Sequence, residues 1–168
     1  MIAIEQISDT SVRENAAPGD GLTFRERDLT PELLKSLIKL SVDWEGEDSC
    51  WGYRRNTEQD ITGNRIFVAE RGSELVGYLF GHIEAAKNST SIMQVGTAYF
   101  EVEELYVIPE CRGRDVGRFL FASAEQAMVG KVEYVLLSTA TKDWKRILHF
   151  YIDELGMEFW NARLFKKI

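Results

Sequence analysis

The sequence predicts a single α/β (α+β) domain in which a mixed, mostly antiparallel sheet of six to seven strands is flanked by about four helices. Segments that alternate apolar and polar residues are interspersed with segments whose apolar residues recur at helical spacing. Residues 65–70 and 74–84 are two such strand patterns, separated by a short Arg-Gly-Ser turn that is typical of a hairpin. At 168 residues and 45% hydrophobic, the chain can bury one good core. We expect residues 22–168 to form this domain, after an N-terminal extension over residues 1–21.

The first half of the domain begins with a strand and a capped helix. Residues 22–27 alternate apolar and polar side chains, as a strand does. Thr30-Pro31 then supplies a helix cap and a proline at the first helical position, and apolar residues at helical spacing continue to about Ser41. Residues 42–55 interleave acids and aromatics without a period, so a loop is predicted there, followed by a short helix over residues 57–61.

The second half, after the hairpin, alternates strands and helices. A strand is predicted over residues 98–108, and the helix that follows the next loop has a good terminator in Gly130. Residues 132–138 are dense in apolar side chains, as expected for a strand inside the sheet. Helical spacing predicts a last helix over residues 143–156, and the alternation of residues 159–165 predicts a final strand.

Composition excludes several classes of function. A net charge of −7 argues against general nucleic-acid binding, because that affinity comes mainly from Lys and Arg. Two cysteines, Cys50 and Cys111, are too few for a disulfide framework, and residues 1–20 lack the pattern of a secretory signal. No apolar run approaches the roughly 20 residues that a membrane helix needs. We therefore expect a cytoplasmic protein that does not enter the membrane and that accommodates a small cationic partner more easily than a nucleic acid.

Arginine and glycine cluster where the strand over residues 98–108 gives way to the next helix. Arg112, Arg114 and Arg118 fall within seven residues of this acidic chain. Helix starts present unpaired N–H groups and a partial positive charge, so such a loop suits a phosphate or pyrophosphate. Judged alone, the loop is equally well explained as a tight strand-to-helix turn.

The element order, together with this loop, resembles the GNAT superfamily of N-acetyltransferases over nearly the whole chain. The family signature [Q/R]-x-x-G-x-[G/A] follows a strand that ends in an apolar residue, any residue and proline. Here Val107-Ile108-Pro109 precedes the run Arg112 to Gly117, and Asp115 stands where the first glycine is usual. Asp keeps the backbone N–H and tolerates left-handed backbone. We expect its carboxylate to turn back onto the helix start, with Arg114 and Arg118 offsetting its charge.

The resemblance implies that acetyl-CoA is a co-substrate. In GNAT proteins the fourth and fifth strands splay apart, and the pantetheine arm of coenzyme A hydrogen-bonds into the gap like an extra strand. By this analogy the backbone of Leu105, Tyr106 and Val107 would hold the arm, and an N–H group there would stabilise the oxyanion. The diphosphate would bind the loop and helix start, which comprise Arg112, Gly113, Arg114, Asp115, Val116, Gly117 and Arg118. No Cys and His spacing suggests a metal site.

Acetyl transfer to an amine also needs a base, and three glutamates crowd the strand before the loop. Simple alternation places Glu101 and Glu103 on one face and Glu104 on the other. Glu103 is the first candidate for the base and Glu104 the second, because either lies close to the expected carbonyl site; His82 is a weaker candidate. The alternative is that these acids are exposed at a strand end or only attract a cationic substrate.

Tyr151 is the candidate acid, because many GNAT proteins place a tyrosine on the last helix before a Gly-Phe pair. The usual spacing is Tyr-x-x-x-Gly-Phe, whereas Gly156 follows Tyr151 by five positions and Met157 replaces Phe. Strict alignment puts Ile152 at the tyrosine position, and a one-residue bulge in the helix would restore Tyr151. The alternative makes Tyr151 a packed core aromatic. Cys111 has no neighbouring His or Asp as an activator, so direct transfer without an acyl-enzyme is favoured.

The acidic and aromatic stretch after the first helix is the expected site of acceptor recognition. Its candidate substrate residues are Trp44, Glu45, Glu47, Asp48 and Trp51. Acids and aromatic faces together suit an organic cation, such as an aminoglycoside, a polyamine, or the lysine or N-terminal amine of a peptide. A solvated loop whose tryptophans cover the core is the plainer alternative.

Two other classes of function stay open at this point. One is a GNAT-like module that binds acyl-CoA without catalysis. The other is an interaction protein that uses the arginine cluster on an acidic or RNA partner. The final strand over residues 159–165 can also pair between subunits, which would give a homodimer.

Overall fold

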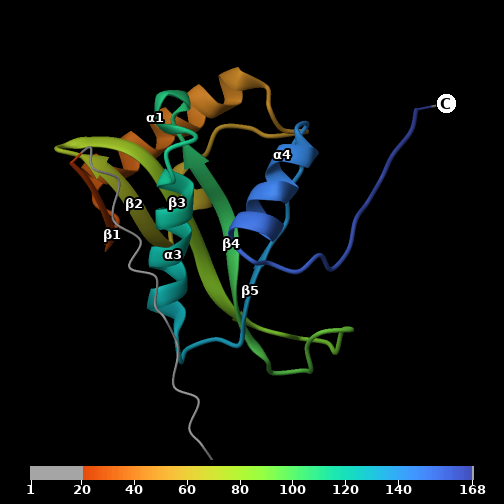
Figure 1. Cartoon of the computed structure of the whole chain (residues 1–168). Helices are drawn as coiled ribbons and strands as arrows, with labels where there is room; N and C mark the ends of the chain where they lie inside the picture. Colours follow the sequence, from red (N-terminus) through yellow and green to blue (C-terminus); the bar gives the residue numbers. More distant parts are fainter. Residues whose placement is uncertain (1–20, 168) are drawn as a thin grey trace, which may run out of the picture.

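A five-stranded sheet separates two layers of helices in the computed structural model, which describes residues 21–167 (Figure 1). Strands β1 (Leu22–Arg27), β2 (Arg65–Arg71), β3 (Glu74–Ala85) and β4 (Ala98–Val107) follow one another as antiparallel neighbours. The last strand, β5 (Tyr134–Leu137), lies parallel to β4. The 1–20 part of the expected N-terminal extension lies outside the described residues.

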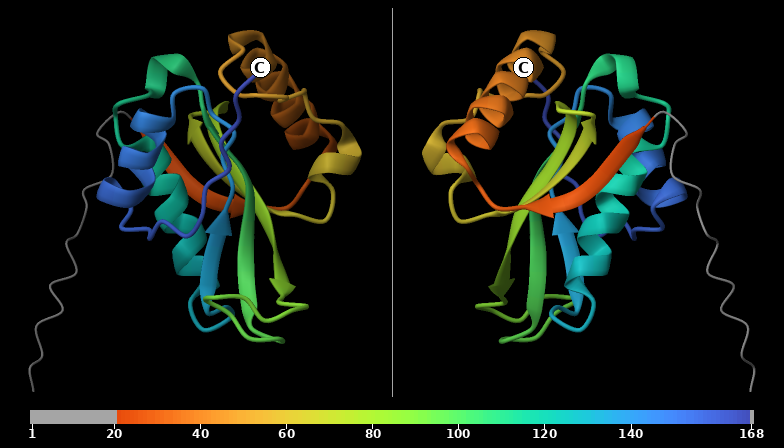
Figure 2. Two further views of the ribbon diagram at one scale, coloured as in Figure 1. Left: turned by 90° about the vertical axis from the view of Figure 1, so that its right-hand side faces the viewer. Right: turned by 90° about the vertical axis from the view of Figure 1, so that its left-hand side faces the viewer.

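The helices cover both faces of the sheet (Figure 2). One face carries α1 (Pro31–Glu47) and α2 (Glu58–Ile61), and the other carries α3 (Val116–Met128) and α4 (Trp144–Leu148). A short 3₁₀ turn, η1 (Pro109–Cys111), precedes α3, and a π-helical segment, η2 (His149–Glu154), continues α4. None of the helices within residues 21–167 has the length and apolar character needed to span a membrane.

Helix α1 begins as the sequence predicts but runs further. Leu33 N donates to Thr30 Oγ1 at 3.2 Å, and Pro31 occupies the first turn. The predicted end near Ser41 is wrong, and so is the loop over its first residues, because α1 continues to Glu47. Trp44 extends the apolar stripe of α1 by one more turn and packs beside the same cluster, but the acids on either side hide this periodicity in the sequence.

The predicted sheet of six to seven strands is also wrong, because residues 159–165 form no strand. Trp160 Nε1 donates to Ser91 Oγ at 2.8 Å, and the ring of Phe165 meets the ring of Trp51 with centroids 5.5 Å apart. Within residues 21–167, no other strand pairs with β5 on the side away from β4. Alternation shows that a segment has two different faces, but a strand also requires a neighbouring backbone to pair with.

A β-bulge at Glu103 switches the faces of β4. Phe80 pairs with Glu104 while Gly81 pairs with Val102, so Glu103 is the extra residue. Before the bulge, even-numbered residues such as Val102 pack under α3; after it, Leu105 does so. Glu104 therefore shares the α1 face with Glu101, which corrects the simple alternation predicted from the sequence.

Candidate active site

Strands β4 and β5 pair over only four residues each, and a cleft opens beyond them. The pairing runs from Tyr99 with Tyr134 to Val102 with Leu137. Within the described chain, residues 103–107 of β4 have no β5 partner, and β4 continues past the end of β5 in Figure 1. The cleft has a volume of about 930 Å³ and is lined by residues 102–107 on one side and 137–141 on the other. Its unpaired backbone can hydrogen-bond an extended ligand as a further strand would.

The turn between η1 and α3 closes one end of this cleft. Gly113 and Asp115 both adopt left-handed backbone, with φ values of 69° and 61°, so Asp115 does take the conformation expected of the signature position. Its Oδ1 accepts a hydrogen bond from Arg118 Nε at 3.2 Å instead of capping the helix. Gly117 allows a close approach, because a Cβ there would lie 3.2 Å from Phe150 Cζ on η2. Val116, Gly117 and Arg118 line the cleft, so the start of α3 adjoins it with the N–H groups that a helix leaves unpaired in its first turn.

Arg112 connects this turn to α1 on the opposite face of the sheet. Its Nε donates to Val107 O at 2.8 Å, and its Nη2 donates to Glu47 Oε1 at 2.7 Å. The guanidinium also lies over the ring of Tyr106, 5.4 Å from the centroid. Its side chain is thereby engaged within the protein, and Arg114 is exposed in the same turn.

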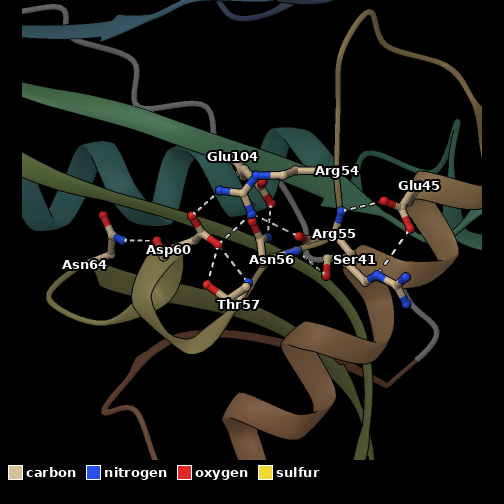
Figure 3. Close-up of polar contacts among 9 residues, drawn as sticks. All are labelled: Ser41, Glu45, Arg54, Arg55, Asn56, Thr57, Asp60, Asn64 and Glu104. Carbon is tan, nitrogen blue, oxygen red and sulfur yellow. Dashed lines mark hydrogen bonds and ion pairs between the residues drawn. The ribbon is translucent and has the colours of Figure 1, made fainter.

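Glu104 enters the cleft from the α1 face and is held by neutral donors (Figure 3). Asn56 Nδ2 and Tyr78 Oη each donate to Glu104 Oε2 at 2.8 Å. The backbone N–H of Asn56 in turn donates to the buried Ser41 Oγ at 3.0 Å. Burial raises the pKa of Glu104, and the hydrogen bonds lower it by less. Both of these hydrogen bonds use Oε2, which leaves Oε1 able to accept one from a ligand.

Glu103, at the bulge, also lines the cleft but in a wetter setting. Its side chain is 47% exposed, and its Oε1 lies 3.5 Å from His82 Nδ1. Burial, followed by the charge of Glu103, raises the pKa of the nearby Glu101. The three glutamates of this strand are therefore in three different environments.

Tyr151 lines the cleft because η2 adds one residue to the last helix. Leu155 N donates to Phe150 O at 3.1 Å, five positions back along the chain, which is the π-helical pattern. The one-residue bulge that would restore Tyr151 to the tyrosine position is therefore present, and Tyr151 lines the cleft while Ile152 does not. Burial raises the pKa of Tyr151 to about 12, so its hydroxyl stays protonated at neutral pH.

This geometry agrees with comparisons to known proteins. Residues 32–157 match the Acetyltransferase (GNAT) family. The chain belongs to this family. No curated protein sequence matches it significantly.

Solved structures share the GNAT fold at low sequence identity. An aminoglycoside acetyltransferase from an uncultured soil metagenomic sample, solved with trehalose, is 14% identical with a TM-score of 0.64, over 90% of this chain and 99% of that one. A Trypanosoma brucei acetyltransferase is 16% identical with a TM-score of 0.59, over 87% and 100%. A transcriptional regulator from Bacillus halodurans is 19% identical with a TM-score of 0.62, over 87% and 100%. At such identities the likeness shows the fold alone.

The predicted substrate residues of this GNAT domain divide into two groups. Trp44, Glu47 and Trp51 line the cleft, whereas Glu45 and Asp48 do not. Glu45 pairs with Arg55 at 3.5 Å and Asp48 with Lys142 at 2.6 Å.

The segment after α1 also bridges the mouth of the cleft. Trp51 N donates to Ala140 O at 2.8 Å, and Lys142 N donates to Ser49 O at 2.9 Å. These bonds tie the α1–α2 connection to the β5–α4 connection. The stretch predicted to recognise the acceptor thus partly serves to fasten the two sides of the cleft together.

Several residues at the site carried no local signal in the sequence. Asn56 and Tyr78 become partners of Glu104 only through contacts 48 and 26 positions apart. Tyr53 lines the cleft, and its buried hydroxyl has no hydrogen-bond partner among the described residues. Cys50 also lines the cleft, and burial raises the pKa of its thiol. Its predominantly protonated state at neutral pH disfavours a nucleophilic role.

The part of the chain that the structure describes contains no group of three or more His, Cys, Asp or Glu side chains that could hold a metal ion. Glu104 and Tyr151 line the same cleft as residues 103–107 of β4 and the start of α3.

Proposed function

We propose that this protein is an N-acetyltransferase that moves an acetyl group from acetyl-CoA directly to a primary amine of a small cationic acceptor or a peptide. The observation that supports it most is the edge of β4 over residues 103–107, which has no β5 partner within the described residues and is followed, after η1, by the N-terminus of α3. The pantetheine arm would hydrogen-bond along this backbone, and the diphosphate would sit on the first N–H groups of α3. Glu104 and Tyr151 face the same cleft.

The β4 backbone would activate the acetyl group for attack by the amine. An N–H group near Leu105 would donate to the acetyl carbonyl oxygen and to the negative charge that develops on it when the amine attacks. A preorganised donor of this kind contributes about 3 kcal/mol in other acyl-transfer enzymes. The new C–N bond forms as the C–S bond breaks, and the acetyl group never resides on the protein.

Glu104 is the base that the geometry favours over Glu103. An amine must lose its proton to attack, and a carboxylate with a raised pKa is the stronger base. Glu104 has such a pKa and a position fixed by Asn56 and Tyr78. Glu103 is more exposed and lies beside His82. Glu104 would therefore bind the ammonium form and then accept its proton.

Tyr151 would stabilise the thiolate that leaves. Its pKa of about 12 is well above the roughly 8.5 of an ordinary thiol, so complete proton transfer to sulfur is uphill. A hydrogen bond from the hydroxyl to the thiolate is favourable without transfer. The released coenzyme A would take its proton from solvent.

Titration calorimetry with acetyl-CoA, followed by a thiol-release assay over a panel of amines, tests this function. We expect saturable acetyl-CoA binding and release of free coenzyme A that depends on the amine. Absence of acetyl-CoA binding would overturn the proposal. Binding without amine-dependent thiol release from any amine would instead support a non-catalytic acyl-CoA-binding module.

A further inference from the structure

We infer that Arg112 is a positioning residue, which fixes where the pantetheine arm of acetyl-CoA pairs with β4 and takes no part in holding the diphosphate. This inference rests on the proposed function and reassigns one residue that the sequence placed at the diphosphate. It comes from the atoms that the Arg112 side chain contacts and from the direction of the β4 backbone groups.

The direction of the β4 backbone shows which groups an arm could use. Ile108 N donates to Val76 O at 3.0 Å, so the Ile108 N–H points toward β3. The backbone groups of successive residues point to opposite sides of a strand. Those of Leu105 and Val107 therefore point away from β3, toward the part of the cleft where β4 has no β5 partner within the described residues. An arm that lies along this edge would pair with these two residues.

Arg112 occupies the last carbonyl of this edge. Its Nε donates to Val107 O at 2.8 Å. The Leu105 N–H, the Leu105 carbonyl and the Val107 N–H then remain to pair with a ligand. A slip of the arm by one pairing step, which is two residues along the strand, would move its thioester by about 7 Å. By occupying Val107 O, Arg112 disfavours the slip toward α3 and favours the register that places the thioester carbonyl at Leu105.

The Arg112 guanidinium is held in this place from the acceptor side of the cleft. Its Nη2 donates to Glu47 Oε1 at 2.7 Å, and Tyr106 Oη donates to the same oxygen at 2.8 Å. The guanidinium also lies over the Tyr106 ring, 5.4 Å from its centroid. A planar guanidinium is well suited to bonding two acceptors and a ring face at once. Its charge is paired with that of Glu47, so the diphosphate would be held by the N–H groups at the start of α3.

Arg112→Met separates positioning from phosphate binding when it is assayed with two donors. S-Acetylpantetheine has the arm of acetyl-CoA without the diphosphate. At a fixed amine concentration, we expect kcat/KM to fall by the same factor with both donors, about tenfold or more, because a misplaced thioester slows the reaction whichever donor carries it. A loss confined to acetyl-CoA would overturn the inference, because Arg112 would then act through the diphosphate.

ADP gives the complementary measurement, because it has the diphosphate without the arm. Its dissociation constant, obtained by competition against acetyl-CoA in calorimetry, should be the same in wild type and Arg112→Met. Weaker ADP binding in the variant would assign Arg112 to the diphosphate after all. This comparison requires no turnover, so it also decides the inference if S-acetylpantetheine reacts too slowly to follow.

Glu47→Ala tests the same contact from the acceptor side, and it serves also if Arg112→Met does not fold. Positioning predicts a fall in kcat/KM of about three- to tenfold, with little further loss when the change is combined with Arg112→Met, because both act on one contact. Tighter acetyl-CoA binding in Glu47→Ala would contradict positioning, since the released guanidinium would then be serving the diphosphate. Any of these contrary results leaves acetyl transfer by the wild type intact, whereas absence of thiol release with every amine would remove the proposed function as well.

Discussion

The two sides of the cleft that we propose to bind acetyl-CoA and the amine, here called the donor half and the acceptor half, are built in different ways. The donor half comes from one continuous stretch, residues 105–118, and it presents mostly backbone groups. The acceptor half collects side chains from α1, the α1–α2 connection, β3 and β4, which are joined by contacts such as that between Asn56 and Glu104, 48 positions apart. A backbone site tolerates changes in its side chains, whereas a side-chain site depends on each of them. The donor half can therefore be recognised from a short motif, and the acceptor half only from the folded chain.

The largest expected effect is on the acceptor side. Glu104→Gln keeps the shape of the side chain and removes the base, so kcat should fall by about 10²- to 10⁴-fold. Acetyl-CoA affinity, measured by calorimetry, should not change, because the donor half uses other groups. Glu103→Gln is the matched control, and its kcat should change much less. A larger loss in Glu103→Gln than in Glu104→Gln would assign the base to the bulge instead.

Tyr151→Phe removes the hydroxyl that we propose to stabilise the leaving thiolate, at the place where the donor and acceptor halves adjoin. Losing a hydrogen bond to a charged sulfur costs about 1.5–3 kcal/mol, or roughly 10- to 100-fold in kcat. The packing of the ring is retained, so the melting temperature and the acetyl-CoA affinity should stay close to wild type. An unchanged kcat would make Tyr151 a core aromatic, as the alternative interpretation of the sequence has it.

Much of the fold was predictable because its signals are local. The hairpin, the α1 cap and the left-handed Asp115 each depend on a few adjacent residues. The predictions that were wrong depend on contacts between distant parts of the chain. The pairing of β4 with β3 places a bulge at Glu103, and residues 159–165 have no neighbouring strand within residues 21–167 to pair with.

The candidate site likewise has some features that the local sequence indicates and others that depend on distant contacts. The spacing around Tyr151 left open either Ile152 at the tyrosine position or a one-residue helical bulge, and η2 supplies the bulge. In contrast, nothing near Glu47 in the sequence indicates that Arg112 neutralises it, and nothing near Glu104 indicates Asn56 or Tyr78 as partners. The acids of the acceptor stretch suggested a site for an organic cation, although the folded chain pairs Glu45, Glu47 and Asp48 with basic side chains.

A smaller effect is expected on the donor side, at the residue that departs from the family signature. Asp115→Asn retains tolerance of left-handed backbone but removes a negative charge near the expected diphosphate. Acetyl-CoA should bind about three- to tenfold more tightly, since a like charge near a partly exposed site costs on the order of 1 kcal/mol. The gain in acetyl-CoA affinity should be smaller at high salt, because salt screens the charge. Calorimetry at two salt concentrations measures this affinity, and Asp115→Gly should behave similarly. Weaker binding in both variants would mean that the carboxylate assists the site by orienting Arg118.

The pH dependence of stability tests the environment of Glu104 in the acceptor half, with the smallest expected effect. Burial raises the pKa of Glu104 in the folded chain, so the folded state holds this proton more tightly than the unfolded state. The resulting stabilisation is present below the unfolded value of about 4.3 and is lost as pH rises through the folded pKa. The free energy of unfolding of wild type, minus that of Glu104→Gln, should therefore decrease from pH 4 to pH 8 in urea titrations. Glu26→Gln is a control of opposite sign, because its hydrogen bond from Arg65 lowers the pKa of Glu26 and the corresponding difference should increase as pH rises. A rising difference for Glu104 would mean that its charged form is favoured by the fold, and the carboxylate would then serve as a structural hydrogen-bond acceptor and a poor base.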